Sequence, residues 1–169
     1  MNLQIEKVPG PIGTILLVFE GENLRALDFS DYEDRMHRLL KLHYGIVTLA
    51  PGHTPIRNEI EAYFEGDLKA IARIPVQTAG TAFQREVWKA LTTIPPGATK
   101  TYGEIAAAIE RPKAVRAVGA ANGANPVGIV VPCHRVIGAN GSLTGYGGGM
   151  DRKKWLLAHE LRVSTSNRP

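Results

Sequence analysis

The second half of the fold is decided by residues 101–122, TYGEIAAAIERPKAVRAVGAAN. Thr101 and Glu104 form a capping-box pattern, in which each side chain can satisfy an exposed amide at a helix start. Residues 110–112, Glu-Arg-Pro, favour a tight turn, and an alanine-rich helix is expected over residues 113–122. Two short helices joined in this way predict a helix-turn-helix. The spacing alone leaves open whether the pair binds DNA or only packs.

Charge and side-chain size suit the second helix of this pair to a nucleic acid. Lys113 and Arg116 supply positive charge, and alanines such as Ala117 leave the helix slim enough to approach a duplex. The whole chain carries 20 Lys and Arg against 16 Asp and Glu, a formal net charge of +4. This balance favours a polyanionic partner without requiring one.

A linker separates this region from the first part of the chain. Pro75 and the small residues 77–80 lie between two strongly patterned segments, and residues 81–84 repeat the capping-box spacing that starts a helix. We therefore predict two domains, residues 1–78 and residues 79–169.

Strand and helix patterns fill the first domain. Residues 12–19 and 23–29 predict a hairpin, and residues 71–76 predict a last short strand. Between them, apolar side chains recur at helical spacing in residues 32–43 and 56–64. The expected fold class is α/β (α+β), with a small N-terminal sheet-and-helix domain followed by a mainly helical domain.

Several classes of protein are disfavoured. No stretch approaches the roughly 20 apolar residues of a membrane helix, and the N-terminus lacks a leader pattern, so we expect a cytoplasmic protein without a membrane partner. The single cysteine excludes an internal disulfide. No cysteine stands near His37, His43 or His53 in the sequence, so no metal site is expected.

The clearest chemistry lies at Cys133. Residues 127–131 form an apolar run typical of a buried strand, which leads into Pro-Cys-His-Arg. A lone cysteine is more often a small buried hydrophobe than a nucleophile. As a nucleophile it would need a neighbouring base, and His134 is adjacent. Because adjacent strand residues point to opposite faces, we expect a turn or a bridging water between the two side chains.

The last helix, expected over residues 151–161, offers an acid to orient His134. Glu160 is the candidate, although its spacing alone is equally typical of a surface residue. The glycine-rich residues 145–149 lack the Gly-Lys-Ser/Thr ending of a nucleotide loop, so no nucleotide cofactor is expected. A loop that closes over a flat ligand and a simple turn both remain open for this segment.

These motifs together resemble the O6-alkylguanine-DNA alkyltransferase family. The resemblance is carried by segments that follow in order through the second half: residues 83–88 (FQREVW), 101–103 (TYG), 116–119 (RAVG), 125–126 (NP), 132–138 (PCHRVIG), 145–149 (GYGGG) and 155–160 (WLLAHE). The first half is similar to this family in layout more than in residues, and the resemblance implies a ribonuclease H-like N-terminal domain.

The resemblance implies catalytic roles for five residues. Cys133 would accept the alkyl group, with His134 as its water-mediated base and Glu160 as the acid behind that histidine. Asn125 would brace the turn beside the site. Tyr102 would lie near the extruded base and its phosphate, where a phenol can supply a proton as guanine leaves.

The resemblance also implies contacts with DNA and with the base. Arg116 would fill the gap that an extruded base leaves in the duplex, and the second helix would enter the minor groove. The implied DNA-binding set is Arg116, Tyr102, Lys113, Ala117, Asn122 and Arg135. The implied substrate pocket is Val136, Tyr146 and Gly147.

The implied activity is irreversible transfer of an alkyl group from O6-alkylguanine in double-stranded DNA to Cys133, once per molecule and without a cofactor. Activity on O4-alkylthymine is left open. We expect a monomer, with cooperative binding on DNA also left open. Some members have serine or alanine at the position of Gly147, and some bind zinc in the first domain. With Gly147 here, backbone amides must supply the hydrogen bond to the guanine oxygen that a side chain supplies in those members. No zinc is expected, because the first domain of this chain has no cysteine.

Two other functions are weighed against this one. A cysteine hydrolase could use the same Cys-His-Glu set, but it would turn over repeatedly and would not explain Arg116. A catalytically inert sensor of alkylated DNA would use the helix pair alone, but relatives of that kind lack the cysteine.

Overall fold

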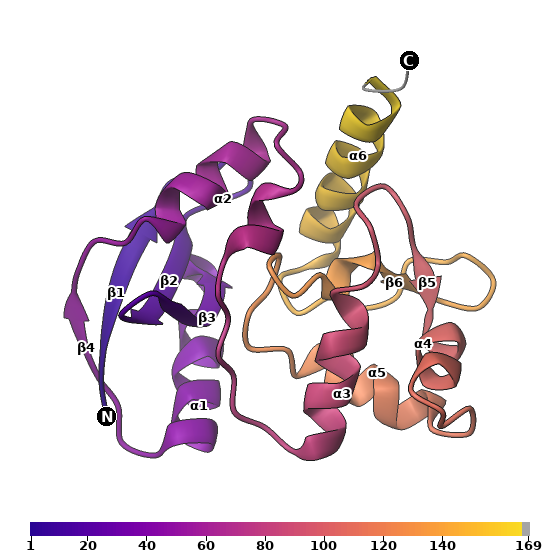
Figure 1. The fold of residues 1–169 in the computed structure, drawn as a ribbon, viewed down its shortest axis with the longest axis horizontal. Coiled ribbons are helices and arrows are strands. Elements are labelled where there is room, and N and C mark those ends of the chain that lie inside the picture. The colour runs from indigo at the N-terminus through magenta and orange to yellow at the C-terminus, as the bar shows by residue number, and fades with distance from the viewer. Residues whose placement is uncertain (167–169) are drawn as a thin grey trace. The chain divides into compact units, whose positions relative to one another are not determined.

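The computed structural model describes residues 1–166 and divides into two compact units (Figure 1). Unit 1 comprises Met1–Gly80 and Pro126–Val130, and unit 2 comprises Thr81–Asn125 and the chain from Val131 onward. The division after Gly80 lies two residues beyond the expected boundary. The chain also returns briefly to unit 1 at Pro126–Val130, which differs from the predicted second domain over residues 79–169.

Unit 1 is built on a four-stranded sheet in the order β3-β2-β1-β4. Its strands are β1 (Asn2–Val8), β2 (Ile15–Glu20), β3 (Asn23–Phe29) and β4 (Thr48–Pro51). β2 and β3 form the expected antiparallel hairpin, with a register shift between Val18 and Phe19. β1 pairs antiparallel with β2 and parallel with β4. The residue pattern did not predict β1, whose many polar side chains obscure the alternation, or the four-residue strand β4.

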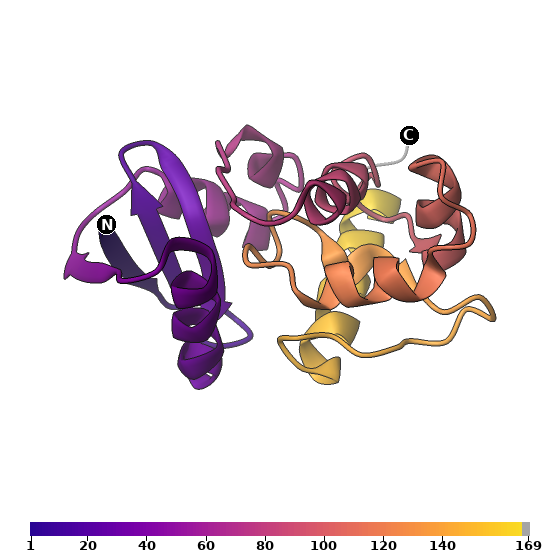
Figure 2. The same cartoon turned by 90° about the horizontal axis from the view of Figure 1, so that it is seen from below.

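Helices α1 (Glu33–Tyr44) and α2 (Ile56–Phe64) confirm the two helical patterns of this unit and lie on opposite sides of the sheet (Figures 1 and 2). The one-turn 3-10 helix η1 (Ser30–Tyr32) precedes α1. On the α1 side, the buried core comprises Leu3, Leu16, Val18, Ala26, Met36 and Leu40. Because alternate strand residues point to opposite faces, the buried Ile15, Leu17 and Phe19 line the other side, and both faces of the sheet are covered.

The strand expected at residues 71–76 is wrong. A 3-10 helix, η2 (Ala70–Arg73), occupies its first half, and only Val76 forms a bridge, to Leu24. Pro75 has no amide hydrogen to donate to a strand ladder, which limits pairing at this point.

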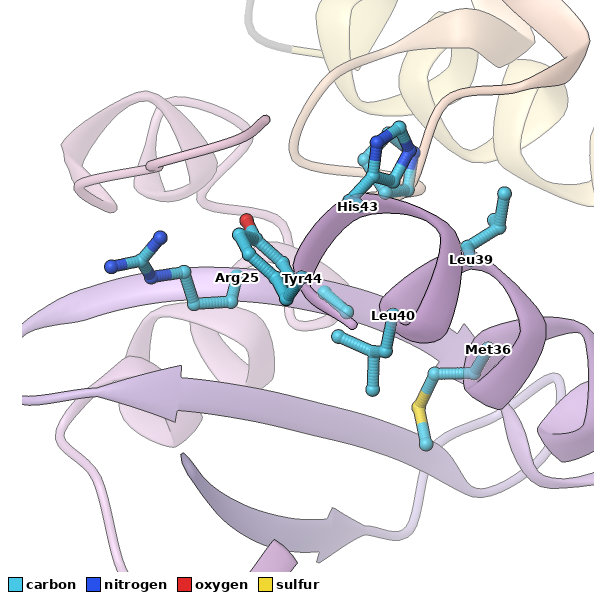
Figure 3. Close-up of a pocket in the computed structure, with 8 residues that line it drawn as sticks. Arg25, Met36, Leu39, Leu40, His43 and Tyr44 are labelled. Atoms are coloured by element: carbon cyan, nitrogen blue, oxygen red, sulfur yellow. The ribbon is translucent and has the colours of Figure 1, made fainter. Parts of the chain in front are cut away.

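A cavity of unit 1 lies beside α1 and is lined by Arg25, Ala26, Met36, Leu39, Leu40, His43, Tyr44 and Pro126 (Figure 3). It encloses about 10 Å³, which is room for no more than one water molecule. The Arg25 guanidinium carbon lies 5.3 Å from the centre of the Tyr44 ring, and both residues line the cavity. This cavity is therefore a packing gap and not a ligand site.

Unit 2 is mainly helical. Its helices are α3 (Ala82–Leu91), α4 (Tyr102–Ala108), α5 (Val115–Gly123) and α6 (Met150–Ser166). The strands β5 (Lys100–Thr101) and β6 (Val136–Ile137) form a short parallel pair. Both expected capping boxes are present, at Thr81 and Thr101. The Trp88 indole on α3 donates a 2.8 Å hydrogen bond to the carbonyl of Ala121 on α5, which joins these two helices.

The strand expected at residues 127–131 is also wrong. Only Val127 pairs, through a single bridge to Leu27 within unit 1, and the chain then turns. Ile129 is fully buried and has a φ of 68°, a left-handed conformation that costs a branched side chain about 1–3 kcal/mol. Apolar content here reflects burial of a turn and not a strand. Among the described residues, no helix is both long and apolar enough to cross a membrane.

Candidate active site

Cys133 begins a one-turn 3-10 helix, η3 (Cys133–Arg135), directly after Pro132. Its backbone amide donates to the carbonyl of Val131 at 2.8 Å, and the Arg135 amide donates to the carbonyl of Pro132 at 3.0 Å. This turn confirms the expectation that the backbone leaves an extended conformation here. The cysteine is 7% exposed, so only a small part of it reaches the surface.

His134 and Glu160 meet in the interior of unit 2. The histidine Nε2 lies 2.8 Å from Glu160 Oε2, and both side chains are completely buried. Glu160 lies on α6, 26 residues further along the chain. The histidine Nδ1 is buried and has no hydrogen-bond partner within residues 1–166. An ionised carboxylate can only accept a hydrogen bond, so Nε2 carries the proton and Nδ1 presents its lone pair.

Arg135 also belongs to this interior cluster. Its guanidinium donates to both carboxylate oxygens of Glu160, from Nε at 2.8 Å and from Nη2 at 2.9 Å. The remaining Nη1 donates to the carbonyl of Ile94 at 2.7 Å. Arg135 is only 3% exposed, so the DNA contact expected for it is corrected. Its planar fork instead grips Glu160 in a geometry well suited to a carboxylate.

Burial and charge set the protonation states of this cluster. Burial lowers the pKa of His134 below its usual 6.5, against the opposing effect of Glu160, so the ring is neutral at pH 7. Burial alone would raise the pKa of Glu160. The interactions with His134 and Arg135 outweigh it and hold that pKa far below the usual range. The site therefore combines a neutral imidazole with an ionised glutamate.

Two asparagines hold the backbone around the cysteine. Asn125 Nδ2 donates to the carbonyl of Val131 at 2.8 Å, which is the position expected of a brace. Asn122 Nδ2 lies 3.4 Å from the carbonyl of Cys133 itself. Asn122 is 5% exposed and lies on the buried side of α5, where it contacts the Cys133 backbone. The expected contact between Asn122 and DNA is therefore corrected.

Tyr102, the first residue of α4, is half-buried, and its phenol oxygen lies 2.6 Å from the Thr144 hydroxyl. Thr144 belongs to the segment between β6 and α6. The carbonyl of Thr144 accepts a 3.0 Å hydrogen bond from the ammonium of Lys153, which donates to the carbonyl of Val136 at 2.6 Å as well. Lys153 is fully buried and interacts electrostatically with Cys133.

The three expected pocket residues differ in their surroundings. Val136 is fully buried in β6, directly after the turn that holds Cys133. The Tyr146 ring is half-buried and lies edge-on to His134, with 6.5 Å between the ring centres. Gly147 is exposed. The histidine and Tyr146 are thus adjacent, whereas Gly147 lies at the surface of the loop.

The exposed residues of the helix pair include the three that suit a nucleic acid. Lys113, Arg116 and Ala117 all have exposed side chains on α5 or just before it. The turn before α5 is bordered by a shallow depression lined by Arg111, Pro112, Lys113 and Ala114. Both the charge and the small side chains expected from the sequence therefore face solvent.

Sequence reasoning missed four residues of the site. Arg135 and Asn122 were expected to contact DNA, and Lys153 and Thr144 were not considered. A helical periodicity could have found Lys153, because it shares the buried face of α6 with Leu156 and Glu160 at intervals of three and four residues. No local pattern identifies Arg135 as the partner of Glu160.

One unit thus combines a helix pair with exposed basic residues and a buried His134–Glu160 pair next to Cys133, an arrangement suited to a DNA-binding protein that uses a cysteine. Comparison with known sequences makes this specific. Residues 6–78 match the ribonuclease-like domain of 6-O-methylguanine DNA methyltransferase, and residues 82–162 match its DNA binding domain. The chain belongs to the 6-O-methylguanine DNA methyltransferase family, and its second unit is the DNA-binding domain of that family.

Individual relatives agree over nearly the whole chain. A methylated-DNA--protein-cysteine methyltransferase of Salmonella typhimurium is 48% identical over 167 residues, which cover 95% of this chain and 96% of the relative. The protein of that name from Methanosarcina mazei is also 48% identical, over 90% of this chain and 94% of its own.

Solved structures show the same fold. The crystal structure of the Mycobacterium tuberculosis O6-methylguanine methyltransferase is 41% identical and has a TM-score of 0.78, covering 99% of this chain and 95% of its own. A crystal structure of OGT from M. tuberculosis in complex with DNA is 42% identical, with a TM-score of 0.78 and coverage of 96% and 94%.

Proposed function

We propose that this chain is a methylated-DNA–protein-cysteine methyltransferase that repairs O6-methylguanine in DNA by transferring the methyl group to Cys133. The observation that carries the proposal is the buried His134–Glu160 pair, with its neutral, oriented imidazole, directly after Cys133 in the DNA-binding domain of the family. This placement supplies what a cysteine nucleophile needs, a base beside it and an acid that fixes the tautomer of that base.

The nucleophile forms by proton transfer toward His134. Because Glu160 occupies Nε2, the lone pair on Nδ1 is the basic site of the ring. A water molecule between the sulfur and Nδ1 can carry the thiol proton to the imidazole. The resulting thiolate is stabilised by the nearby ammonium of Lys153.

The transfer itself is a displacement at the methyl carbon. The thiolate forms a new S–C bond while the C–O6 bond breaks, and the electron pair of that bond stays with the guanine. The departing guanine takes up a proton, which Tyr102 supplies. The product is a thioether, which water does not reverse. Since the chain has only one cysteine to accept the group, each molecule acts once. No cofactor is needed, because the departing guanine requires a proton and not an electron sink.

The substrate is O6-alkylguanine in double-stranded DNA. A stacked base is out of reach of a buried sulfur, so the nucleotide must leave the duplex at a cost of a few kcal/mol. Exposed Arg116 on α5 fills the gap, and Lys113 contacts phosphate. The slim face around Ala117 suits the minor groove. We further propose a monomer in the cytoplasm, where cellular thiols keep a lone cysteine reduced.

Intact-protein mass spectrometry tests the proposal. After mixing with an oligonucleotide that carries one O6-methylguanine, the protein gains one methyl group, the gain stops at one per molecule, and Cys133→Ala gains none. Cys133→Ala still binds the duplex, because α5 is unchanged. An unmodified wild-type protein that binds this DNA tightly would contradict methyl transfer and indicate an inert sensor of alkylated DNA. Repeated turnover without a stable adduct would instead indicate a hydrolase.

A further inference from the structure

A chain of hydrogen bonds links Tyr102 to the interior of unit 2 through Thr144. The two hydroxyl oxygens are 2.6 Å apart although the residues are 42 positions apart in the sequence. Both side chains are half-buried, so each keeps one side open to solvent. This contact is the hydrogen bond that holds the phenol oxygen.

Thr144 is itself held from the interior. Its carbonyl oxygen accepts a hydrogen bond from the Lys153 ammonium, which also binds the carbonyl of Val136. A buried ammonium is costly unless acceptors surround it, so these two carbonyls are matched to it and resist displacement. Thr144 is therefore tied to both α6 and β6, which immediately follows the turn of Cys133.

We propose that Thr144 is a positioning residue for alkyl transfer: its hydroxyl holds the Tyr102 phenol at the reacting base, and Lys153 fixes Thr144 in turn. This inference rests on the proposed function, because it assigns a partner to the phenol that protonates the departing guanine.

The chemistry of the two hydroxyls suits this role. A threonine hydroxyl rotates freely and both donates and accepts hydrogen bonds. When it donates to the phenol oxygen, the hydrogen of the phenol remains directed at the base. As that proton moves to guanine and the C–O6 bond breaks, negative charge develops on the phenol oxygen. The same hydrogen bond from Thr144 then stabilises this charge at a geometry set before the reaction.

Thr144→Val removes the hydroxyl and keeps the side-chain shape. Methyl transfer from an O6-methylguanine duplex at saturating DNA slows roughly 3- to 10-fold, the worth of one hydrogen bond, whereas the Kd for the duplex changes by less than about twofold. Thr144→Ser retains the hydroxyl and transfers within about twofold of the wild type. The rate at which iodoacetamide alkylates Cys133 is equal in all three proteins, because this reaction does not use the phenol. An equal rate shows that the site is intact.

A double-mutant cycle with Tyr102→Phe assigns the effect to the phenol. Thr144→Val has no further effect once Tyr102 is Phe, because no phenol oxygen remains to be held. Equal transfer by Thr144→Val and the wild type, or the same loss in the Tyr102→Phe background, would overturn the positioning role. Failure of the wild-type protein itself to gain a methyl group would overturn the proposed function instead, so the two failures are distinguishable.

Discussion

At the scale of single residues, Glu160 determines the state of the site. It binds His134 through one oxygen and Arg135 through both, and all three side chains lie in the interior. The interactions with His134 and Arg135 keep the carboxylate ionised, and the carboxylate keeps the histidine proton on Nε2. One buried carboxylate thus fixes both the charge and the tautomer on which the proposed base depends.

This cluster predicts that the protein is sensitive to acid. The pKa of His134 is lowered from 6.5 by burial, so below pH 6.5 the unfolded chain binds a proton that the folded chain does not. The lowered pKa of Glu160 acts in the same direction below pH 4.5. The free energy of unfolding should therefore decrease as pH falls below 6.5, by up to about 1.4 kcal/mol per pH unit for each such group.

Urea unfolding in buffers from about pH 7.5 to about pH 4 measures this dependence. His134→Gln should have a shallower slope than the wild type just below pH 6.5, because glutamine binds no proton in either state. His37→Gln, which changes an exposed histidine of α1, is the matched control for the loss of an imidazole. Identical slopes for wild type and His134→Gln would show that this histidine is not held neutral.

At the scale of elements, two capping boxes set where the helices of the DNA-binding region begin. At the start of α3, the side chains of Thr81 and Gln84 each accept a 3.0 Å hydrogen bond from the backbone amide of the other residue. Thr101 and Glu104 do the same at the start of α4, both at 3.1 Å. The cap at Thr101 places Tyr102 at the first position of its helix, so local helix chemistry determines where the phenol is presented.

We predict that Thr81→Ala lowers the free energy of unfolding by about 1 kcal/mol, because an amide of the first turn of α3 loses its hydrogen-bond acceptor. Urea unfolding of unit 2, followed by the fluorescence of Trp88 and Trp155, measures the change. Thr165→Ala is a matched control in the last turn of α6, and it shifts stability by less than about 0.5 kcal/mol. An equal effect of both substitutions would indicate that the capping box contributes nothing.

At the scale of the whole molecule, the proposed function requires that one unit carry both exposed basic residues at α5 and the buried Cys133. Lys113 and Arg116 are exposed, whereas His134 and Glu160 are not exposed at all. Reaction with a base in duplex DNA therefore has two separable requirements, the opening of the duplex and the chemistry at sulfur. A substitution in the helix pair should affect only the first of them.

Arg116→Ala tests this separation. We predict that it slows transfer from O6-methylguanine in a duplex more than transfer from the free base, because only the duplex has a gap to fill. Rate constants for both substrates, measured by protein mass, give the comparison. Arg38→Ala removes an exposed arginine of α1 in unit 1 and controls for charge. Equal losses on both substrates would exclude the gap-filling role.

The sequence by itself determined the features that depend on neighbours in the chain. Capping boxes at Thr81 and Thr101, the helical stripes and the β2–β3 hairpin follow from interactions within a few residues, so their patterns are readable. The order of motifs around Cys133 likewise indicated the family before any geometry was known, because so many ordered matches identify common descent and need no packing information.

Only the tertiary structure decided which distant side chains meet. The family resemblance implied that Glu160 lies behind His134, 26 residues away, but no local pattern showed their contact. Nothing in the sequence connected Thr144 with Tyr102, which is 42 residues away. The burial of Arg135 and the pairing of Val127 with β3 likewise needed the fold. Such contacts depend on how whole elements pack and on which face of each is covered, and the free energy that selects them is shared among many residues. These contacts therefore cannot be predicted from local sequence patterns.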